Sequence, residues 1–331
     1  MASYIFVSLH DDDLISRFDI SQGLPDTRLD FTLPGGPAPL VINPKKTRIF
    51  AGMRKSNELA CIQIGKDADL SIAAKAMLPS DPCFVGMDRE GTHIFTTYYK
   101  AGQIAVHRWN ENNDAMTETQ RISTEKNAHS IWFESTNRYV YVPHTGPNKI
   151  YLYNFERHNG TLKAQIPPCF VPEGHLEPRH LCFHPDNNHL YTVNEGSSTV
   201  SVYDYDQETG TIKCTQTVST LPSAGIKGNT TAEIRISPNG NFLYASNRGH
   251  DSIACYVVEA NSGLVKVTAC TPVPAKPRSF DISPDGRFLY AAGQDSGELA
   301  AYEIDQNNGS LKEVSRFFIG NCPMWVMAVL L

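Results

Sequence analysis

The residues best suited to chemistry are histidines, arginines and carboxylates that stand at the edges of apolar runs. His129 precedes one such run, Arg179 and His180 open another, and Glu195 and Arg248 follow two more. A carboxylate or a neutral imidazole can remove a proton from water, and a guanidinium can hold an anionic oxygen. Charged groups are rarely buried without partners. If these side chains meet in one place, they would therefore suit a polar, anionic ligand.

An internal repeat reveals the elements that must position these residues. Each copy has an apolar strand, a tight turn (Ser-Pro-Asp-Gly or Ser-Pro-Asn-Gly in the clearest cases) and a second strand. The copies span residues 40–52, 85–97, 130–143, 181–193, 234–246 and 280–292, of which the second and third lack the proline. Their turns lie 45 to 53 residues apart, at Pro44, Arg89, Glu134, Pro185, Pro238 and Pro284.

A period of this length is typical of the four-stranded blade of a β-propeller. The second half of each repeat holds another hairpin turn, such as Thr209-Gly210 or Ser262-Gly263. A seventh repeat is split between the chain ends, with residues 325–328 as its first strand and residues 4–8 as its second. We therefore predict an all-β, seven-bladed β-propeller of four-stranded antiparallel blades, one domain over residues 1–331. Pairing of the N- and C-terminal strands would close the ring and remove its exposed sheet edges.

The repeat register predicts which side chains meet at one mouth of the central channel. If the first strand of each blade is innermost, its start and the end of the second strand share one rim. Those positions, or their neighbours, hold the candidate site residues His129, Arg179, His180, Glu195, Arg248, Arg54, Arg278, Gln294, Glu233, His144 and Trp325. Two alternatives to a ligand site stay open. These residues could form a ring of structural ion pairs around a water-filled channel, and Glu233 could only pair with Arg235 or Arg248.

The amino-acid composition limits the kinds of partner that the protein is expected to bind. The 331 residues include 29 Lys and Arg against 35 Asp and Glu, a net charge of −6 that argues against nucleic acid. No apolar run is long enough for a membrane helix and no signal peptide is recognisable, so we expect a cytoplasmic protein without a membrane partner. The eight cysteines form no C-x-x-C pair, and we expect reduced thiols, no zinc motif and no cofactor. A monomer or a weak homodimer is expected.

Several segments resemble the bacterial seven-bladed β-propeller lactonase family, which includes 6-phosphogluconolactonases and shares its fold with muconate lactonising enzymes. These segments are residues 177–185 (Glu-Pro-Arg-His-Leu-Cys-Phe-His-Pro), 191–195, 128–130, 246–248, 276–278, 291–294 and 320–326. The resemblance covers the whole chain. It implies hydrolysis of a sugar-acid lactone, 6-phosphoglucono-δ-lactone to 6-phosphogluconate, and it places His129, Arg179, His180, Glu195 and Arg248 at the active site.

The implied reaction suggests a role for each candidate. An activated lactone needs a base to deprotonate water and cations to stabilise the oxyanion, with no metal or covalent nucleophile. We hypothesise that Glu195, assisted by His129, is the base, although the two could exchange roles. Arg179 and Arg248 would stabilise the oxyanion, and His180 would donate to the ring oxygen or to a hydroxyl. The substrate would be oriented by Arg54, Arg278 and Gln294.

One segment departs from the family. Its phosphogluconolactonases often carry a basic residue shortly after a Val-Pro pair, whereas here Val142-Pro143 is followed by His144-Thr145-Gly146-Pro147. Unphosphorylated hexono-, urono- or aldarolactones therefore stay open as substrates. A lactone isomerase or cycloisomerase at the same site also stays open, as does a metal held by ligands from separate blades. A non-enzymatic binding propeller is less favoured, because no tryptophan is followed by aspartate as in interaction propellers.

Overall fold

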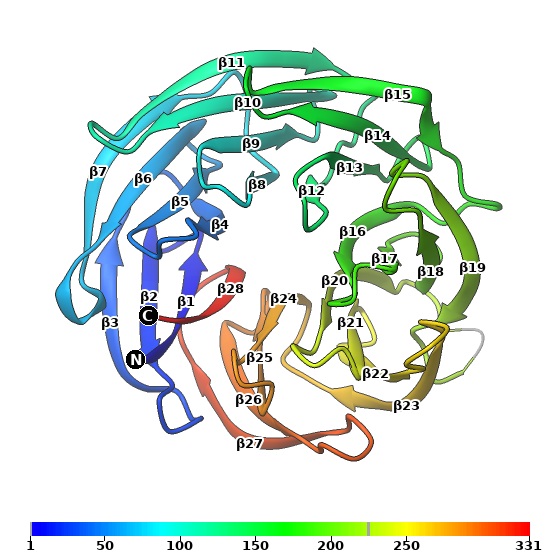
Figure 1. The fold of residues 1–331 in the computed structure, drawn as a ribbon. Helices are drawn as coiled ribbons and strands as arrows, with labels where there is room; N and C mark the ends of the chain where they lie inside the picture. The colour runs from blue at the N-terminus through cyan, green and yellow to red at the C-terminus, as the bar shows by residue number, and fades with distance from the viewer. Residues whose placement is uncertain (1, 224–225) are drawn as a thin grey trace.

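The computed structural model describes residues 2–223 and 226–331, which form seven four-stranded antiparallel sheets around a central axis (Figure 1). The first sheet contains β28 (Pro323–Leu330), β1 (Ser3–Leu9), β2 (Leu14–Asp19) and β3 (Asp26–Thr32). The next three contain β4 (Pro37–Ile42), β5 (Arg48–Met53), β6 (Glu58–Ile64) and β7 (Leu70–Met77); β8 (Phe84–Met87), β9 (His93–Tyr98), β10 (Gln103–Asn110) and β11 (Ala115–Ser123); and β12 (Trp132–Phe133), β13 (Tyr139–His144), β14 (Lys149–Glu156) and β15 (Thr161–Phe170).

The remaining three sheets contain β16 (Pro178–Phe183), β17 (His189–Asn194), β18 (Thr199–Tyr205) and β19 (Ile212–Ser219); β20 (Thr230–Ile236), β21 (Phe242–Arg248), β22 (Ser252–Val258) and β23 (Val265–Pro272); and β24 (Pro277–Ile282), β25 (Phe288–Gly293), β26 (Glu298–Ile304) and β27 (Leu311–Phe318). Within the described residues, the one helical element is a short 3₁₀ turn at Lys66–Ala68. None of the helical structure described is long and apolar enough to cross a bilayer. The predicted seven-bladed, all-β architecture is confirmed.

The two ends of the chain close the ring. Strand β28 pairs with β1 in antiparallel register from Ser3 opposite Leu330 to Leu9 opposite Pro323. Both ends therefore lie in the same blade, as Figure 1 shows. The split seventh repeat predicted this pairing of the terminal strands, and it is confirmed.

A repeated contact joins neighbouring blades. In four blades a tyrosine of the second strand donates its hydroxyl hydrogen bond to a glycine carbonyl in the outer turn of the next blade. The pairs are Tyr141 with Gly210, Tyr191 with Gly263, Tyr244 with Gly309 and Tyr290 with Gly23, at 2.6 to 3.0 Å. The glycine is required in these turns because its φ is positive and a Cβ would collide with an aromatic ring. At Gly309, for example, the ring of Phe242 would lie 2.5 Å from that Cβ.

The innermost strands are β28, β4, β8, β12, β16, β20 and β24, which surround the centre in Figure 1. The start of each pairs with the end of the second strand, for example Pro178 with Asn194 and Thr230 with Arg248. A register shift interrupts several of these pairings, and Arg179 and Arg278 are the residues inside two such bulges. Bulges redirect side chains and are common beside active sites. The inner-strand bulges thus position the side chains at one channel mouth.

Candidate active site

The predicted mouth of the channel contains a narrow pocket. Its lining comes from the starts of the inner strands and the ends of second strands. The lining residues are Ala38, Pro39, Arg54, Cys83, His129, Arg179, His180, Arg278, Met324 and Trp325. All of them lie at the register positions derived above, and five of them are candidate polar residues. The structure therefore brings these candidates together from different blades.

Glu195 holds two of the arginines at this mouth. Its carboxylate lies 3.1 Å from Arg179 Nε and 3.0 Å from Arg248 Nη2. Arg248 also donates to the Thr231 carbonyl at 2.9 Å, and Arg179 donates to the Ala232 carbonyl. Burial alone would raise the pKa of Glu195, but the two guanidiniums outweigh burial and lower that pKa. Glu195 is therefore ionised and is held between the two guanidiniums.

Arg54 and Arg278 line the pocket together with Arg179. Arg54 lies 3.0 Å from the carboxylate of Asp81, whereas within the described residues no carboxylate lies within 4 Å of Arg278. Burial lowers the pKa of the Arg278 guanidinium, and the charges of Arg248 and Arg54 add to that effect.

Arg248 does not line the pocket but adjoins it, because Glu195 pairs with both Arg248 and the lining residue Arg179. Counted with these neighbours, four guanidiniums face the two carboxylates of Glu195 and Asp81, and we call the whole group the four-arginine pocket. This group has a formal surplus of two positive charges. Such a surplus in a partly buried pocket favours an anion with two negative charges.

Two neutral histidines adjoin the arginines. The rings of His129 and His180 are 5.0 Å apart, and both histidines are buried. Burial, aided by the charge of Arg179, lowers the pKa of both, and that of His180 falls to about 4. His129 lies 3.8 Å from the Cys83 thiol, while His180 Nδ1 lies 3.0 Å from Glu233 Oε1. Both imidazoles are therefore neutral near pH 7.

An aromatic layer forms the floor of the pocket. Trp325 contacts Phe84 with ring centroids 5.6 Å apart, and Phe84 contacts Trp132 at 5.3 Å. His180 packs against Phe84 at 5.5 Å. Below this layer the opposite mouth is largely apolar. Trp325 lines both the polar pocket and this opposite mouth, so the aromatic layer lies between them.

Five sequence candidates lie outside the pocket lining: Glu195 and Arg248, which adjoin it through Arg179, and His144, Glu233 and Gln294. His144 is buried, with Nδ1 2.9 Å from the Val142 carbonyl and Nε2 2.9 Å from Thr124 Oγ1, so both ring nitrogens already have protein partners. Glu233 is completely buried behind His180. Gln294 contacts the Cys322 thiol at 3.7 Å and does not line the pocket. His144 and Glu233 thus already have protein partners outside the pocket lining, and direct substrate binding by these two residues and Gln294 stays a prediction.

The sequence indicated no role for Asp81 or Asp281, and it indicated Arg235 only as a possible partner of Glu233. Asp81 precedes an inner strand and pairs with Arg54. Arg235 follows Glu233 by two residues on β20, so both side chains lie on the same face of the strand. The structure contains this pair, with Arg235 Nη1 2.9 Å from Glu233 Oε1.

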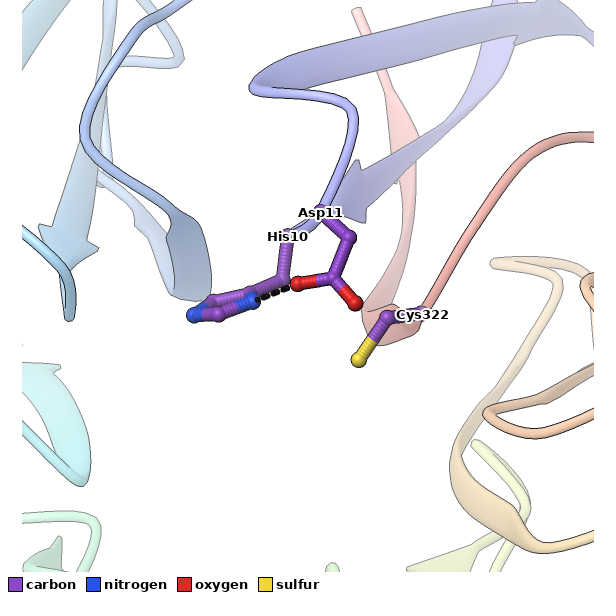
Figure 2. Close-up of side chains that lie close together, drawn as sticks. All are labelled: His10, Asp11 and Cys322. Atoms are coloured by element: carbon purple, nitrogen blue, oxygen red, sulfur yellow. Dashed lines mark hydrogen bonds and ion pairs between the residues drawn. The ribbon is translucent and has the colours of Figure 1, made fainter.

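A separate group of possible metal ligands lies on the rim. His10, Asp11 and Cys322 point toward one another, and their ligand atoms lie within 4.8 Å (Figure 2). These three could hold a borderline ion such as Zn²⁺, and they are the sole such group in the described residues. However, His10 Nδ1 is 2.7 Å and Lys55 Nζ is 3.8 Å from Asp11 Oδ1. Asp11 is 56 % exposed and already has His10 and Lys55 as partners, so we assign this group no cation.

Comparisons with known proteins agree with this fold. The chain matches the family described as "Lactonase, 7-bladed beta-propeller" over residues 5–328. It is 32 % identical to a 6-phosphogluconolactonase of Enterobacter sp. (strain 638) over 296 residues, 89 % of each chain. It is also 32 % identical to a 6-phosphogluconolactonase of Cronobacter sakazakii over 295 residues, 89 % of this chain and 88 % of that one.

A solved structure has the same fold. The periplasmic gluconolactonase of Pseudomonas aeruginosa superposes with a TM-score of 0.91 at 22 % identity, covering 100 % of this chain and 99 % of that one. At this identity the likeness concerns the fold alone. The family match covers nearly the whole chain and agrees with the two curated relatives. The chain therefore belongs to the seven-bladed β-propeller lactonase family and is a lactone-hydrolysing enzyme.

Proposed function

We propose that this lactonase hydrolyses 6-phosphoglucono-δ-lactone to 6-phosphogluconate at the four-arginine pocket. The observation that carries the proposal is a formal surplus of two positive charges, obtained when Arg54, Arg179, Arg248 and Arg278 are counted against Glu195 and Asp81. A phosphate monoester carries close to two negative charges at neutral pH. The curated relatives named 6-phosphogluconolactonases support the same substrate.

Arg54 and Arg278 bind the phosphate in this proposal. Arg278 has no carboxylate partner in the described part of the chain, so its guanidinium is free to form charge-assisted hydrogen bonds. The segment after Val142-Pro143 lacks the basic residue that related phosphogluconolactonases often carry. Arg54 and Arg278, which come from other blades, supply positive charge to the pocket in its place.

Arg179 and Arg248 stabilise the oxyanion. Glu195 holds both guanidiniums at 3.1 and 3.0 Å and so fixes their direction. A donor that is already oriented costs no reorganisation when the negative charge develops, and each such donor contributes about 3–4 kcal/mol to the transition state. We therefore assign Glu195 the role of positioning these arginines. The proton from water passes to one of the two neutral histidines.

The substrate assignment is tested by following acid release at constant pH. Fresh 6-phosphoglucono-δ-lactone is compared with unphosphorylated glucono-, galactono- and hexarolactones, each against its spontaneous opening. We expect kcat/KM for the phosphorylated lactone to exceed the others by at least about 100-fold, since two charge-assisted contacts are lost without phosphate. Equal or higher kcat/KM for an unphosphorylated lactone would contradict the phosphate assignment. Conversion of a lactone without acid release would indicate isomerisation.

A further inference from the structure

A row of side-chain contacts extends from His180 through Glu233 and Arg235 to Asp281. His180 Nδ1 lies 3.0 Å from Glu233 Oε1, and the same oxygen lies 2.9 Å from Arg235 Nη1. Arg235 Nε lies 3.3 Å from Asp281 Oδ1. Glu233 is fully buried, and Oε1 also accepts the backbone N–H of Ile234. The contacts with Arg235 and with the backbone of Ile234 therefore hold the carboxylate of Glu233 in one orientation against the imidazole of His180.

This arrangement fixes the tautomer of His180. Burial alone would raise the pKa of Glu233, but Arg235 and His180 outweigh it and lower that pKa to about 2. An ionised carboxylate only accepts hydrogen bonds, so the hydrogen must sit on His180 Nδ1. In the neutral imidazole the other nitrogen, Nε2, then has a free lone pair. Nε2 is buried and has no hydrogen-bond partner among the described residues, and His180 lines the pocket. A water that reaches this pocket would be the partner that Nε2 lacks.

The other possible bases are less suited to accept a proton. Both oxygens of Glu195 face a guanidinium, one of Arg179 and one of Arg248, so protonation would break two ion pairs. His129 has no carboxylate within 4 Å in the described chain, and its closest polar side-chain contact is the Cys83 thiol. An imidazole paired with a buried carboxylate gains stabilisation when it becomes an imidazolium, as in the catalytic triads of hydrolases.

We propose that His180 Nε2 is the general base of the lactonase and that Glu233, held by Arg235, is its positioning residue. Nε2 takes a proton from water while the water oxygen adds to the lactone carbonyl carbon, and the carbonyl electron pair moves to its oxygen. The tetrahedral intermediate then collapses, the bond from the carbonyl carbon to the ring oxygen breaks, and Nε2–H returns its proton to the departing oxygen. The acid product loses a proton to solvent. This inference rests on the proposed hydrolytic function.

The test compares Glu233→Gln and His180→Gln with a matched control, Glu134→Gln. Glu134 is also fully buried, but it bonds to Thr136, Arg138 and Tyr139 in the turn between β12 and β13. We expect kcat to fall about 10²–10⁴-fold for Glu233→Gln and His180→Gln with KM nearly unchanged, since general-base catalysis contributes that much. The control should keep its kcat.

The pH dependence of kcat/KM distinguishes a positioning role of Glu233 from a purely structural one. His180 faces Glu233 and Arg235 from β20, Arg179 from its own strand, His129 from the adjoining blade, and the uncharged rings of Phe84, Trp132 and Trp325. Wild-type kcat/KM should fall only as the pH drops toward about 4, where His180 becomes protonated. In Glu233→Gln this fall should move to lower pH, because the carboxylate that favours the imidazolium is gone.

A spectroscopic measurement tests the geometry without turnover. ¹⁵N spectra of the wild-type imidazoles, with the His180 signal identified by its loss in His180→Gln, should show hydrogen on Nδ1 and none on Nε2. Hydrogen on Nε2, or wild-type kcat in either active-site variant, would overturn the base assignment while leaving the lactonase intact. If the wild-type protein accelerates the opening of no lactone, the proposed substrate and this base assignment both fail.

Discussion

Replacing Arg278 by methionine tests whether the surplus positive charge of the pocket binds a phosphate. Arg278 lines the pocket, and its pKa is lowered by burial and by the charges of Arg248 and Arg54. A hydrogen bond between charged groups contributes about 1.5–3 kcal/mol, and each 1.4 kcal/mol corresponds to about tenfold in affinity. We therefore expect kcat/KM for 6-phosphoglucono-δ-lactone to fall about 10–150-fold, mainly through KM.

Two readouts distinguish this effect from damage to the fold. Because burial and neighbouring cations already disfavour the charge on Arg278, Arg278→Met should unfold at the same temperature as the wild type or higher. Its rate with unphosphorylated gluconolactone, measured by acid release, should change less than about threefold, since no phosphate contact is lost. Arg316→Met is the matched control, because Arg316 pairs with Glu313 on the outermost strand.

Comparing the two substrates shows whether Arg278 binds the phosphate. Equal losses with the phosphorylated and unphosphorylated lactones would refute a phosphate role for Arg278 and place it at the reacting carbonyl instead. An unchanged KM for the phosphorylated lactone would refute the charge argument altogether.

Three further predictions concern stability, pH and metals. Tyr244→Phe removes the hydrogen bond to Gly309 and should lower the free energy of unfolding by about 1–3 kcal/mol in urea titrations without changing kcat/KM; an unchanged midpoint would contradict the blade contact. Glu195 has a lowered pKa, so its ion pairs stabilise the fold above the unfolded pKa of about 4.3 and are lost as the pH falls below it. Thermal unfolding should therefore show Glu195→Gln less stable than wild type at pH 7 and the gap narrowing by pH 3, whereas a constant gap would oppose the assignment. Chelators should leave the rate of acid release unchanged, because the surplus of positive charge repels divalent cations; a loss that Zn²⁺ or Ca²⁺ restores would count against this.

The repeat in the sequence predicts the blades and their closure because it is a periodic signal spread over the whole chain. Turn residues such as Pro284 and Gly286 fall between β24 and β25, where the pattern places them. The same register predicts which positions line the mouth, since corresponding positions in every blade lie at the same height in the channel. These features depend on periodicity and turn chemistry, which a single sequence displays directly.

The side-chain partners were less predictable because they depend on neighbouring blades. His144 stands beside a rim position, but its ring bonds within its own blade and to Thr124. Glu233 occupies the same register as His180, yet it serves as that histidine's partner. The bulge that contains Arg179 also follows from three-dimensional strand pairing, and no turn motif marks it.

Whether the four-arginine pocket performs the hydrolysis is tested by the initial rate of acid release from 6-phosphoglucono-δ-lactone. The rate is measured for the wild-type protein and for Arg179→Met, with the same circular dichroism spectrum for both. We expect the wild type to accelerate the opening over the spontaneous reaction and the variant to lose about 10²–10³ in kcat, the effect of removing one oxyanion donor. A folded Arg179→Met variant with wild-type kcat would show that the hydrolysis does not depend on this pocket.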